Sequence, residues 1–144
     1  MPTVAYFDAS PTMDFAKVSG KMGAMPNKSS AFLSVTPMIP SGGSLADALR
    51  FYNDELGFSI LWQADNGAGI TRDSVSFNLV ENNNREWIEN SSYSIGVSDL
   101  DALYEEFRKS SARVGPLEVK AWGRREFHMI VPSGVCFQFY ARSK

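Results

Sequence analysis

The order of predicted elements is the same in both halves of this chain, and this repetition constrains the fold more than any other feature. Hydrophobic periodicity predicts one strand, one helix and three strands in each half. In the first half the helix covers Leu45–Leu56, and the strands cover Ala31–Met38, Phe58–Gln63, Ala68–Arg72 and Val75–Val80. In the second half the helix covers Leu100–Phe107, and the strands cover Tyr93–Val97, Leu117–Trp122, Glu126–Val131 and Val135–Tyr140. Both helices contain the triplet Asp-Ala-Leu. The sequence therefore predicts an α+β fold in which two βαβββ modules form curved mixed sheets around a cavity.

One domain preceded by an N-terminal extension is the predicted organisation. The length of 144 residues suits a single domain. The polar, turn-prone segment Glu81–Arg85 separates the two modules. We expect the modules to span 31–81 and 92–142 within a domain that covers 31–144, with residues 1–30 as the extension.

Local signals mark the ends of the helices. Ser44 and Ser98 are the predicted N-caps of the two module helices, and Gly57 is expected to end the first one. In the extension, Ser10-Pro11 predicts the start of a short helix that ends near Gly20 or Gly23.

Composition excludes several classes of function. Lys plus Arg number 14 and Asp plus Glu number 16, and the net charge of −2 argues against binding nucleic acid by neutralising phosphates. Cys136 and His128 are the only residues of their types, so an internal disulfide and a two-histidine zinc site are excluded within one chain. No apolar run approaches the roughly 20 residues of a membrane helix, and the N-terminus lacks the apolar core of a signal peptide. We therefore expect a cytoplasmic protein with neither nucleic acid nor membrane as its partner.

Acidic residues are concentrated in the first module. Between residues 31 and 84, two arginines stand against six acidic residues, which gives a net charge of −4. The six are Asp47, Asp54, Glu55, Asp65, Asp73 and Glu81. Such a surface can attract a cationic ligand by focusing potential in a cleft. Alternatively, these side chains are solvated on helix and loop surfaces.

Alternation along the strands predicts two different faces in each sheet. One face is apolar, as a helix-covered core requires: Leu33, Val35, Phe77, Leu79, Ile95, Val97, Phe137 and Phe139. The opposite face is mixed and small: Ser34, Thr36, Met38, Ser76, Asn78, Val80, Ser92, Ser94, Gly96, Cys136, Gln138 and Tyr140. This contrast predicts a hollow face that lines a cavity, and Cys136 is expected to be a small buried residue rather than a reactive thiol.

Four further side chains are candidates for the same cavity. Trp62 offers a flat surface for stacking or cation–π contact, or else packs in the core or in a dimer interface. Trp122 either forms part of the wall of the same cavity or packs against other residues of the protein. If Phe127 belongs to the core, alternation directs Glu126 and His128 into the cavity, where they would hold a polar ligand. A single histidine on a sheet also serves as a hydrogen-bonded structural residue.

Several motifs resemble one known group. Trp122-Gly123-Arg124-Arg125-Glu126-Phe127 followed by Val131-Pro132-Ser133-Gly134 is similar to the second-module hairpin of the vicinal-oxygen-chelate superfamily, which includes glyoxalases, bleomycin-resistance proteins and extradiol dioxygenases. Phe51-Tyr52 and Leu56-Gly57-Phe58 resemble its first helix and the strand that follows. Thr36-Pro37-Met38-Ile39 is most similar to the bleomycin-resistance type. The resemblance covers residues 31–142.

The resemblance also implies where a metal would bind in the enzymes of the superfamily. Carried over to this chain, the four ligand positions fall at Ser34, Asn78, Ser92 and Gln138. Two hydroxyls and two neutral amides give no negative charge to offset a divalent cation. We therefore predict that the protein binds neither a metal nor another cofactor. The resemblance implies the same absence of metal for proteins of the bleomycin-resistance type.

The interpretation that we favour is a homodimeric protein that sequesters a small molecule, with a preference for cationic drugs or antibiotics, and makes or breaks no bond. The predicted ligand-binding residues are Trp62, Asn78, Ser92, Trp122, Glu126, His128, Gln138 and Tyr140. One alternative is a lyase, isomerase or thiol transferase of the same superfamily, with Glu126, His128 or Tyr140 as acid–base groups or with a site completed across the dimer. A second alternative is a structural module whose hollow face is filled by the N-terminal extension.

Overall fold

The computed structural model describes residues 29–142 and divides the chain into two units, Met1–Ser34 and Val35–Lys144. All helices and strands named below lie in the second unit. The short helix predicted at Ser10-Pro11 lies outside the described residues. Within the described range, no helix is both long enough and apolar enough to cross a membrane.

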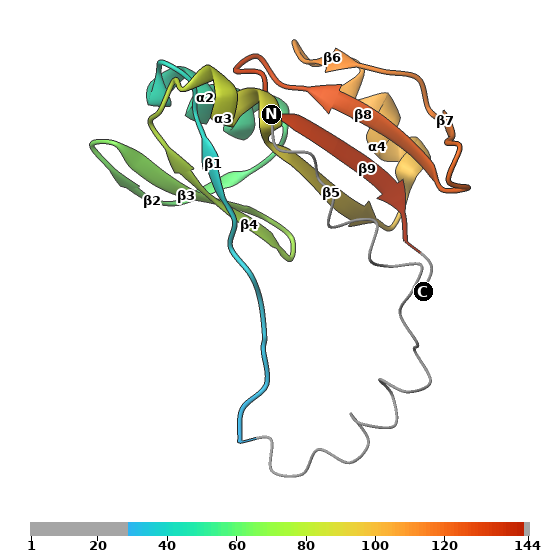
Figure 1. Ribbon diagram of the computed structural model, residues 1–144, viewed down its shortest axis with the longest axis horizontal. Coiled ribbons are helices and arrows are strands. Elements are labelled where there is room, and N and C mark those ends of the chain that lie inside the picture. Colours follow the sequence, from blue (N-terminus) through green and yellow to red (C-terminus); the bar gives the residue numbers. More distant parts are fainter. Residues whose placement is uncertain (1–28, 143–144) are drawn as a thin grey trace. The chain divides into compact units, whose positions relative to one another are not determined.

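The first module forms a four-stranded sheet, sheet A, with the strand order β1-β4-β3-β2 (Figure 1). Its strands are β1 (Met38–Pro40), β2 (Ser59–Ala64), β3 (Gly67–Arg72) and β4 (Val75–Val80). β1 runs parallel to β4, whereas β3 is antiparallel to both of its neighbours, so the sheet is mixed. The α-helix α2 (Leu45–Arg50) continues directly into the π-helical segment η2 (Phe51–Glu55) between β1 and β2.

The second module forms sheet C, with the strand order β5-β9-β8-β6 and a short β7 that also pairs with β8. Its strands are β5 (Ser92–Val97), β6 (Arg113–Val114), β7 (Glu118–Val119), β8 (Arg125–Ile130) and β9 (Cys136–Ala141). β5 is parallel to β9, and β8 is antiparallel to β9. The helix α3 (Arg85–Asn90) precedes β5, and α4 (Leu100–Phe107) follows it.

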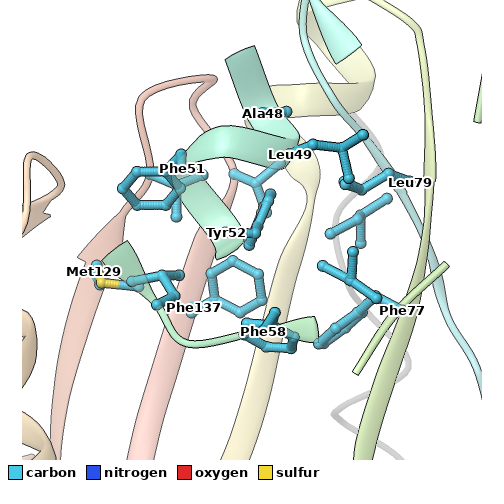
Figure 2. Packing of buried hydrophobic residues seen from close by; sticks show 14 of the residues in the cluster. Ala48, Leu49, Phe51, Tyr52, Phe58, Phe77, Leu79, Met129 and Phe137 are labelled. Atoms are coloured by element: carbon cyan, nitrogen blue, oxygen red, sulfur yellow. The ribbon is translucent and has the colours of Figure 1, made fainter. Parts of the chain in front are cut away.

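The helix-covered faces of both sheets contribute to one hydrophobic core. Tyr52 of η2 makes edge-to-face contacts with Phe58 and with Phe137 of sheet C, at ring-centroid distances of 5.9 and 6.3 Å. Phe77 of sheet A also packs edge-on against Phe137, at 5.7 Å. Figure 2 shows these rings grouped beneath the helix, together with Leu49 and Met129. Because aromatic residues of both modules share this core, the opposite face of each sheet points away from it.

The first strand is the largest departure from the sequence prediction. The predicted strand over Ala31–Met38 is wrong, because pairing begins only at Met38. Pro37 has no N–H to donate to a ladder, and the paired segment starts directly after it. Leu33 and Val35, predicted for the apolar face, are exposed. The predicted strand Leu117–Trp122 is also shorter than expected, since the turn closed by the Gly123 N–H to the Lys120 carbonyl interrupts it.

Helix ends agree with the prediction in the first module and differ in the second. Ser44 caps α2 by accepting a 3.1 Å hydrogen bond from the Asp47 N–H. The cap of α4 is Asp99 rather than the predicted Ser98, and its carboxylate accepts from the Ala102 N–H at 3.0 Å. Helix α3 was not predicted, because the polar linker reads as a turn. Its Asn84 acts as the cap and accepts from the Trp87 N–H at 2.9 Å.

The predicted α+β fold is confirmed. Two curved mixed sheets carry the duplicated order of strand, helix and strands, and neither sheet closes into a barrel (Figure 1). Alternation assigned the core side correctly in the central strands, where Phe77, Leu79, Phe137 and Phe139 are buried. The faces that point away from the core, called open faces below, carry the candidate site.

Candidate functional site

The open face of sheet A carries one residue from each strand in a continuous row. Pairing aligns Met38 of β1 with Asn78 of β4, Asn78 with Gly69 of β3, and Gly69 with Trp62 of β2. Met38 and Trp62 are exposed, and Asn78 is half-buried between them. The row therefore combines an amide with two large polarisable side chains at the surface.

A β-bulge turns Trp62 toward this face. Ile60 pairs with Ile70, but Trp62 pairs with Gly69, so three residues of β2 lie opposite two of β3. Ile70 faces the core, whereas Gly69 shares the face of Asn78. If β2 were regular and Leu61 paired with Gly69, strict alternation would place Trp62 on the same side as Ile60. The bulge thus places Trp62 on the open face rather than in the core.

Gly69 makes room for the Trp62 indole. A Cβ at position 69 would lie only 2.7 Å from Cδ1 and 2.9 Å from Cε2 of the ring. The indole therefore lies across the backbone of β3, with 48% of the residue exposed. A glycine inside a strand marks this kind of close approach. Its position leaves one side of the ring supported and the other side available for stacking.

On sheet C, Gln138 is held by serines of the neighbouring strand. The Ser94 hydroxyl donates to Gln138 Oε1 at 2.8 Å, and Gln138 Nε2 donates to the Ser92 hydroxyl. His128 of β8 pairs with Gln138 on the other side. Both ends of the amide are therefore engaged within the protein, and its orientation is fixed.

Glu126 is the buried centre of a second group on the same face. Its side chain is 1% exposed, and its Oε2 accepts from Arg124 Nε at 2.7 Å and from Trp122 Nε1 at 3.1 Å. His128 Nε2 lies 2.9 Å from the other oxygen, Oε1. Burial of the carboxylate raises its pKa, but the hydrogen bonds from Arg124, His128 and Trp122 outweigh this effect and hold the pKa of Glu126 below its usual range. The carboxylate is therefore ionised at neutral pH.

Arg124 lies over Tyr140 in the same group. The guanidinium carbon is 3.9 Å from the centroid of the Tyr140 ring, a cation–π contact. Tyr140 in turn lies over Gly96, where a Cβ would approach its phenol carbon Cζ and oxygen to 3.0 Å. Each open face thus has an aromatic ring laid across a strand glycine: Trp62 on Gly69 and Tyr140 on Gly96.

The positions at which the resemblance implies metal ligands do not suit a metal. Register places Met38, not Ser34, beside Asn78, so the assignment of Ser34 was wrong. The matching pair on sheet C is Ser94 beside Gln138, whose amide is already engaged. A thioether, two amides and a hydroxyl provide no anionic donor for a divalent cation. Between residues 29 and 142, no group of three or more His, Cys, Asp or Glu is placed to hold a metal ion.

Cys136 shares the open face of sheet C but is an unfavourable nucleophile. It is half-buried, and burial raises the pKa of its thiol despite the opposing hydrogen bonds with Ser92 and Gln138. A raised pKa keeps the thiol protonated at neutral pH, and the thiolate is the reactive form.

A cavity of about 590 Å³ lies beside α2 and η2, away from the open faces. It is lined in part by the loop Ser41–Ser44, by Asp54 and Glu55, and by Ser133 in the β8–β9 turn. Glu55 bonds the Ser111 hydroxyl and N–H, and Glu81 accepts from the first N–H of α2. The acidic residues that predicted a cationic ligand therefore lie at helices and turns rather than on either open face.

The predicted site residues fall into two sets on two sheets. Trp62 and Asn78 lie on sheet A; Ser92, Trp122, Glu126, His128, Gln138 and Tyr140 lie on or beside the strands of sheet C. Sequence reasoning missed Arg124 and Gly69 as site residues, and it placed Gly96 on the hollow face without giving it a role. Arg124 could have been found from its position two residues before Glu126, which places opposite charges on one face of a strand. The two glycines carried the signal of an interior strand glycine.

Comparison with known proteins places the chain in a family. Residues 41–139, more than half of the chain, match the family model of the Glyoxalase/Bleomycin resistance protein/Dioxygenase superfamily. No curated protein matches at a significant level.

Several solved structures have the same fold. The bleomycin-binding protein of bleomycin-producing Streptomyces verticillus, solved with copper(II)-bleomycin, is 25% identical with a TM-score of 0.71, over 79% of this chain and 99% of that chain. A bleomycin resistance determinant encoded on the transposon Tn5 is 17% identical with a TM-score of 0.69, over 78% and 100%. TnmS3, an antibiotic binding protein from Streptomyces sp. CB03234, is 16% identical with a TM-score of 0.60, over 79% and 100%. Because the family model matches more than half of the chain, with strands of both sheets, the chain belongs to the glyoxalase/bleomycin resistance protein/dioxygenase superfamily.

Proposed function

We propose that this chain is a small-molecule-binding protein of the bleomycin-resistance type, which holds a drug or antibiotic without changing it chemically and without a metal. The observation that carries the proposal is the composition of the open faces. Trp62 and Tyr140 lie over strand glycines as flat supports, and the positions that resemble metal sites hold Met38, Asn78, Ser94 and Gln138. Such faces suit stacking and hydrogen bonding of a planar guest, and they lack the donors of a metalloenzyme.

The proposal includes a homodimer in the cytoplasm, in which paired sheets make the binding groove. Trp62 and its neighbours on β2 are exposed, and so is Trp122 beside sheet C. A groove between an open face of sheet A and an open face of sheet C would combine the two sets of predicted site residues. The bleomycin-binding and antibiotic-binding structures of the same fold support binding of this kind.

The proposal includes a preference for cationic ligands. The net charge of −4 between residues 31 and 84 attracts cations at long range. The acidic side chains nevertheless lie at α2, η2 and turns, so they act through the field and do not contact a guest on the open faces.

Titration and recovery of the guest test the proposal together. Full-length protein is titrated with bleomycin and with a panel of planar antibiotics of differing charge, with binding measured by equilibrium dialysis. We expect saturable binding of at least one compound at micromolar concentrations, and at least a tenfold loss in Trp62→Ala, because a stacking contact of about 1.5 kcal/mol corresponds to roughly that factor. Mass spectrometry should recover the bound compound unchanged. Absence of saturable binding across the panel would contradict the proposal.

An enzyme of the same superfamily is the second candidate, and one contact favours it. When His128 Nε2 donates to Glu126 Oε1, at 2.9 Å, Nδ1 is the ring nitrogen that remains to act on a guest. Conversion of more than one guest molecule per protein molecule, abolished by His128→Gln, would establish this candidate over sequestration.

A further inference from the structure

The group around Glu126 indicates which part of a guest sheet C recognises. Glu126 was predicted to contact the ligand, but at 1% exposure with three donors bound, it has no free surface for a guest. Its carboxylate instead holds other side chains in place. Glu126 is therefore a positioning residue. The side chains that it orients, rather than Glu126 itself, are the groups available to contact the guest.

Arg124 is held in two ways. Its Nε is bound to Glu126 Oε2 at 2.7 Å, and one face of its guanidinium lies 3.9 Å from the centre of the Tyr140 ring. Tyr140 rests on Gly96, so this support is itself fixed by the backbone. The side chain of Arg124 is 38% exposed, and its two terminal nitrogens have no hydrogen-bond partner among the described residues. A planar pair of N–H donors with a set orientation remains available.

Trp122 is bound to the same oxygen of Glu126. Its Nε1 donates to Oε2 at 3.1 Å, while the residue is 64% exposed. The indole thus presents an apolar surface next to the Arg124 guanidinium. The two groups are anchored at a single atom, which fixes the spacing between a cationic fork and an aromatic support.

The other charged groups nearby leave Arg124 available. Glu118, which pairs with Glu126 across β7 and β8, is bridged to Lys120 at 2.9 Å. Arg125 is directed elsewhere, since it forms a two-bond ion pair with Asp101 of α4. Of the two adjacent arginines, only Arg124 keeps its terminal nitrogens without a partner in the described part of the chain.

We infer that the open face of sheet C binds an aromatic carboxylate group of its guest, with the carboxylate on the terminal nitrogens of Arg124 and the ring against Trp122. The inference rests on the proposed binding function and names the chemistry of one end of the guest. A guanidinium fork matches the two oxygens of a carboxylate, and its rigidity lowers the entropy lost on binding. Glu126 and Tyr140 supply that rigidity before the guest arrives.

Two matched probes test the inference on the full-length protein. 1-Naphthoate carries the aromatic carboxylate, and 1-naphthamide has the same ring without the charge. We expect saturable binding of 1-naphthoate in equilibrium dialysis, with 1-naphthamide bound at least tenfold more weakly. No saturable binding of 1-naphthoate up to millimolar concentrations, or equal affinity for both probes, would overturn the inference.

Three arginine variants distinguish the effect of the guanidinium geometry from the effect of net charge. Arg124→Gln should weaken 1-naphthoate binding at least tenfold, whereas Arg125→Gln, which removes the same charge from the neighbouring residue, should leave it within twofold. Arg124→Lys keeps the charge without the fork and should also bind more weakly than the native protein, so the test holds if Arg124→Gln does not fold. Equal effects of Arg124→Gln and Arg125→Gln would contradict the inference.

Glu126→Gln tests the positioning role. It should weaken 1-naphthoate binding while leaving 1-naphthamide binding unchanged, because the indole of Trp122 can still donate to an amide oxygen but Arg124 loses its charged partner. A uniform loss for both probes would indicate a merely structural role. If the antibiotic panel binds while 1-naphthoate does not, the binding function stands and this inference fails; if neither binds, both fail.

Discussion

At the scale of single residues, two glycines determine what the open faces can present. Gly69 lies under Trp62, and Gly96 lies under Tyr140. In each case a Cβ would occupy the space that the ring fills. The aromatic rings therefore lie flat on the sheet instead of standing away from it, and a flat ring with one exposed side is the form that stacks on a planar guest. Over an ordinary strand residue Trp62 could not take this position, and Tyr140 would have to shift by a few tenths of an ångström.

Gly69→Ala should displace the Trp62 indole and cost roughly 1–3 kcal/mol of stability, as overpacking does. The added methyl group would lie within 3 Å of two ring carbons. We expect a shift in tryptophan fluorescence and a lower free energy of unfolding in denaturant. Gly43→Ala is the matched control, because its Cβ would meet no atom closer than 3.7 Å. Equal effects of the two substitutions would show that the indole does not depend on the space above Gly69.

At the scale of elements, alternation predicted the faces of the regular strands and failed where the strand is irregular. Phe137 and Phe139 are buried while Gln138 faces outward, as a period of two requires. Trp62 is an exception, because the bulge at Leu61 places the side chains of Ile60 and Trp62 on opposite faces of β2. A bulge depends on the pairing of two strands, and a single strand's sequence does not contain that information. Periodicity alone therefore could not decide whether Trp62 faces the core or the open face.

Side-chain contacts and strand register were the other part that the sequence could not supply. Alternation directed Glu126 outward, but its burial arises from Trp122, Arg124 and His128 folding over it. The same limit applies to the metal positions. Ser34 was chosen from a strand that begins only at Met38, so the partner of Asn78 could be identified only from the register of β1 with β4.

The cap of α4 gives a prediction at this scale. Asp99→Ala should cost about 1 kcal/mol, because the Ala102 N–H loses its acceptor at the helix N-terminus. Ser98→Ala should change the free energy of unfolding by less than about 0.5 kcal/mol, since it substitutes an exposed residue outside the helix. Urea unfolding of both variants measures the difference. A larger loss in Ser98→Ala than in Asp99→Ala would mean that the helix begins one residue earlier.

At the scale of the whole molecule, the shared core and the open faces lie on opposite sides of the two sheets. Both modules send their aromatic residues into one shared core through Phe77 and Phe137. The open faces consequently point away from that core, and a groove that encloses a guest needs a second surface. Within residues 29–142, one chain supplies the row of sheet A that ends at Trp62 and the charged group of sheet C, but it does not supply both sides of one groove. In the proposed homodimer, a partner chain would supply the second side of the groove.

Exposure along β2 gives the prediction for the dimer. β2 is an edge strand of sheet A, and its Ile60, Leu61 and Trp62 are 42%, 61% and 48% exposed. An exposed apolar edge strand is prone to association, so a protein that stays in solution is expected to cover it. Sedimentation of the full-length protein should show a dimer at micromolar concentrations. Leu61→Lys should raise the dimer dissociation constant at least tenfold, whereas Ala46→Lys, which adds the same charge on the exposed side of α2, should not. A native protein that sediments as a monomer at high micromolar concentrations would rule out the dimer and, with it, a groove shared between two chains.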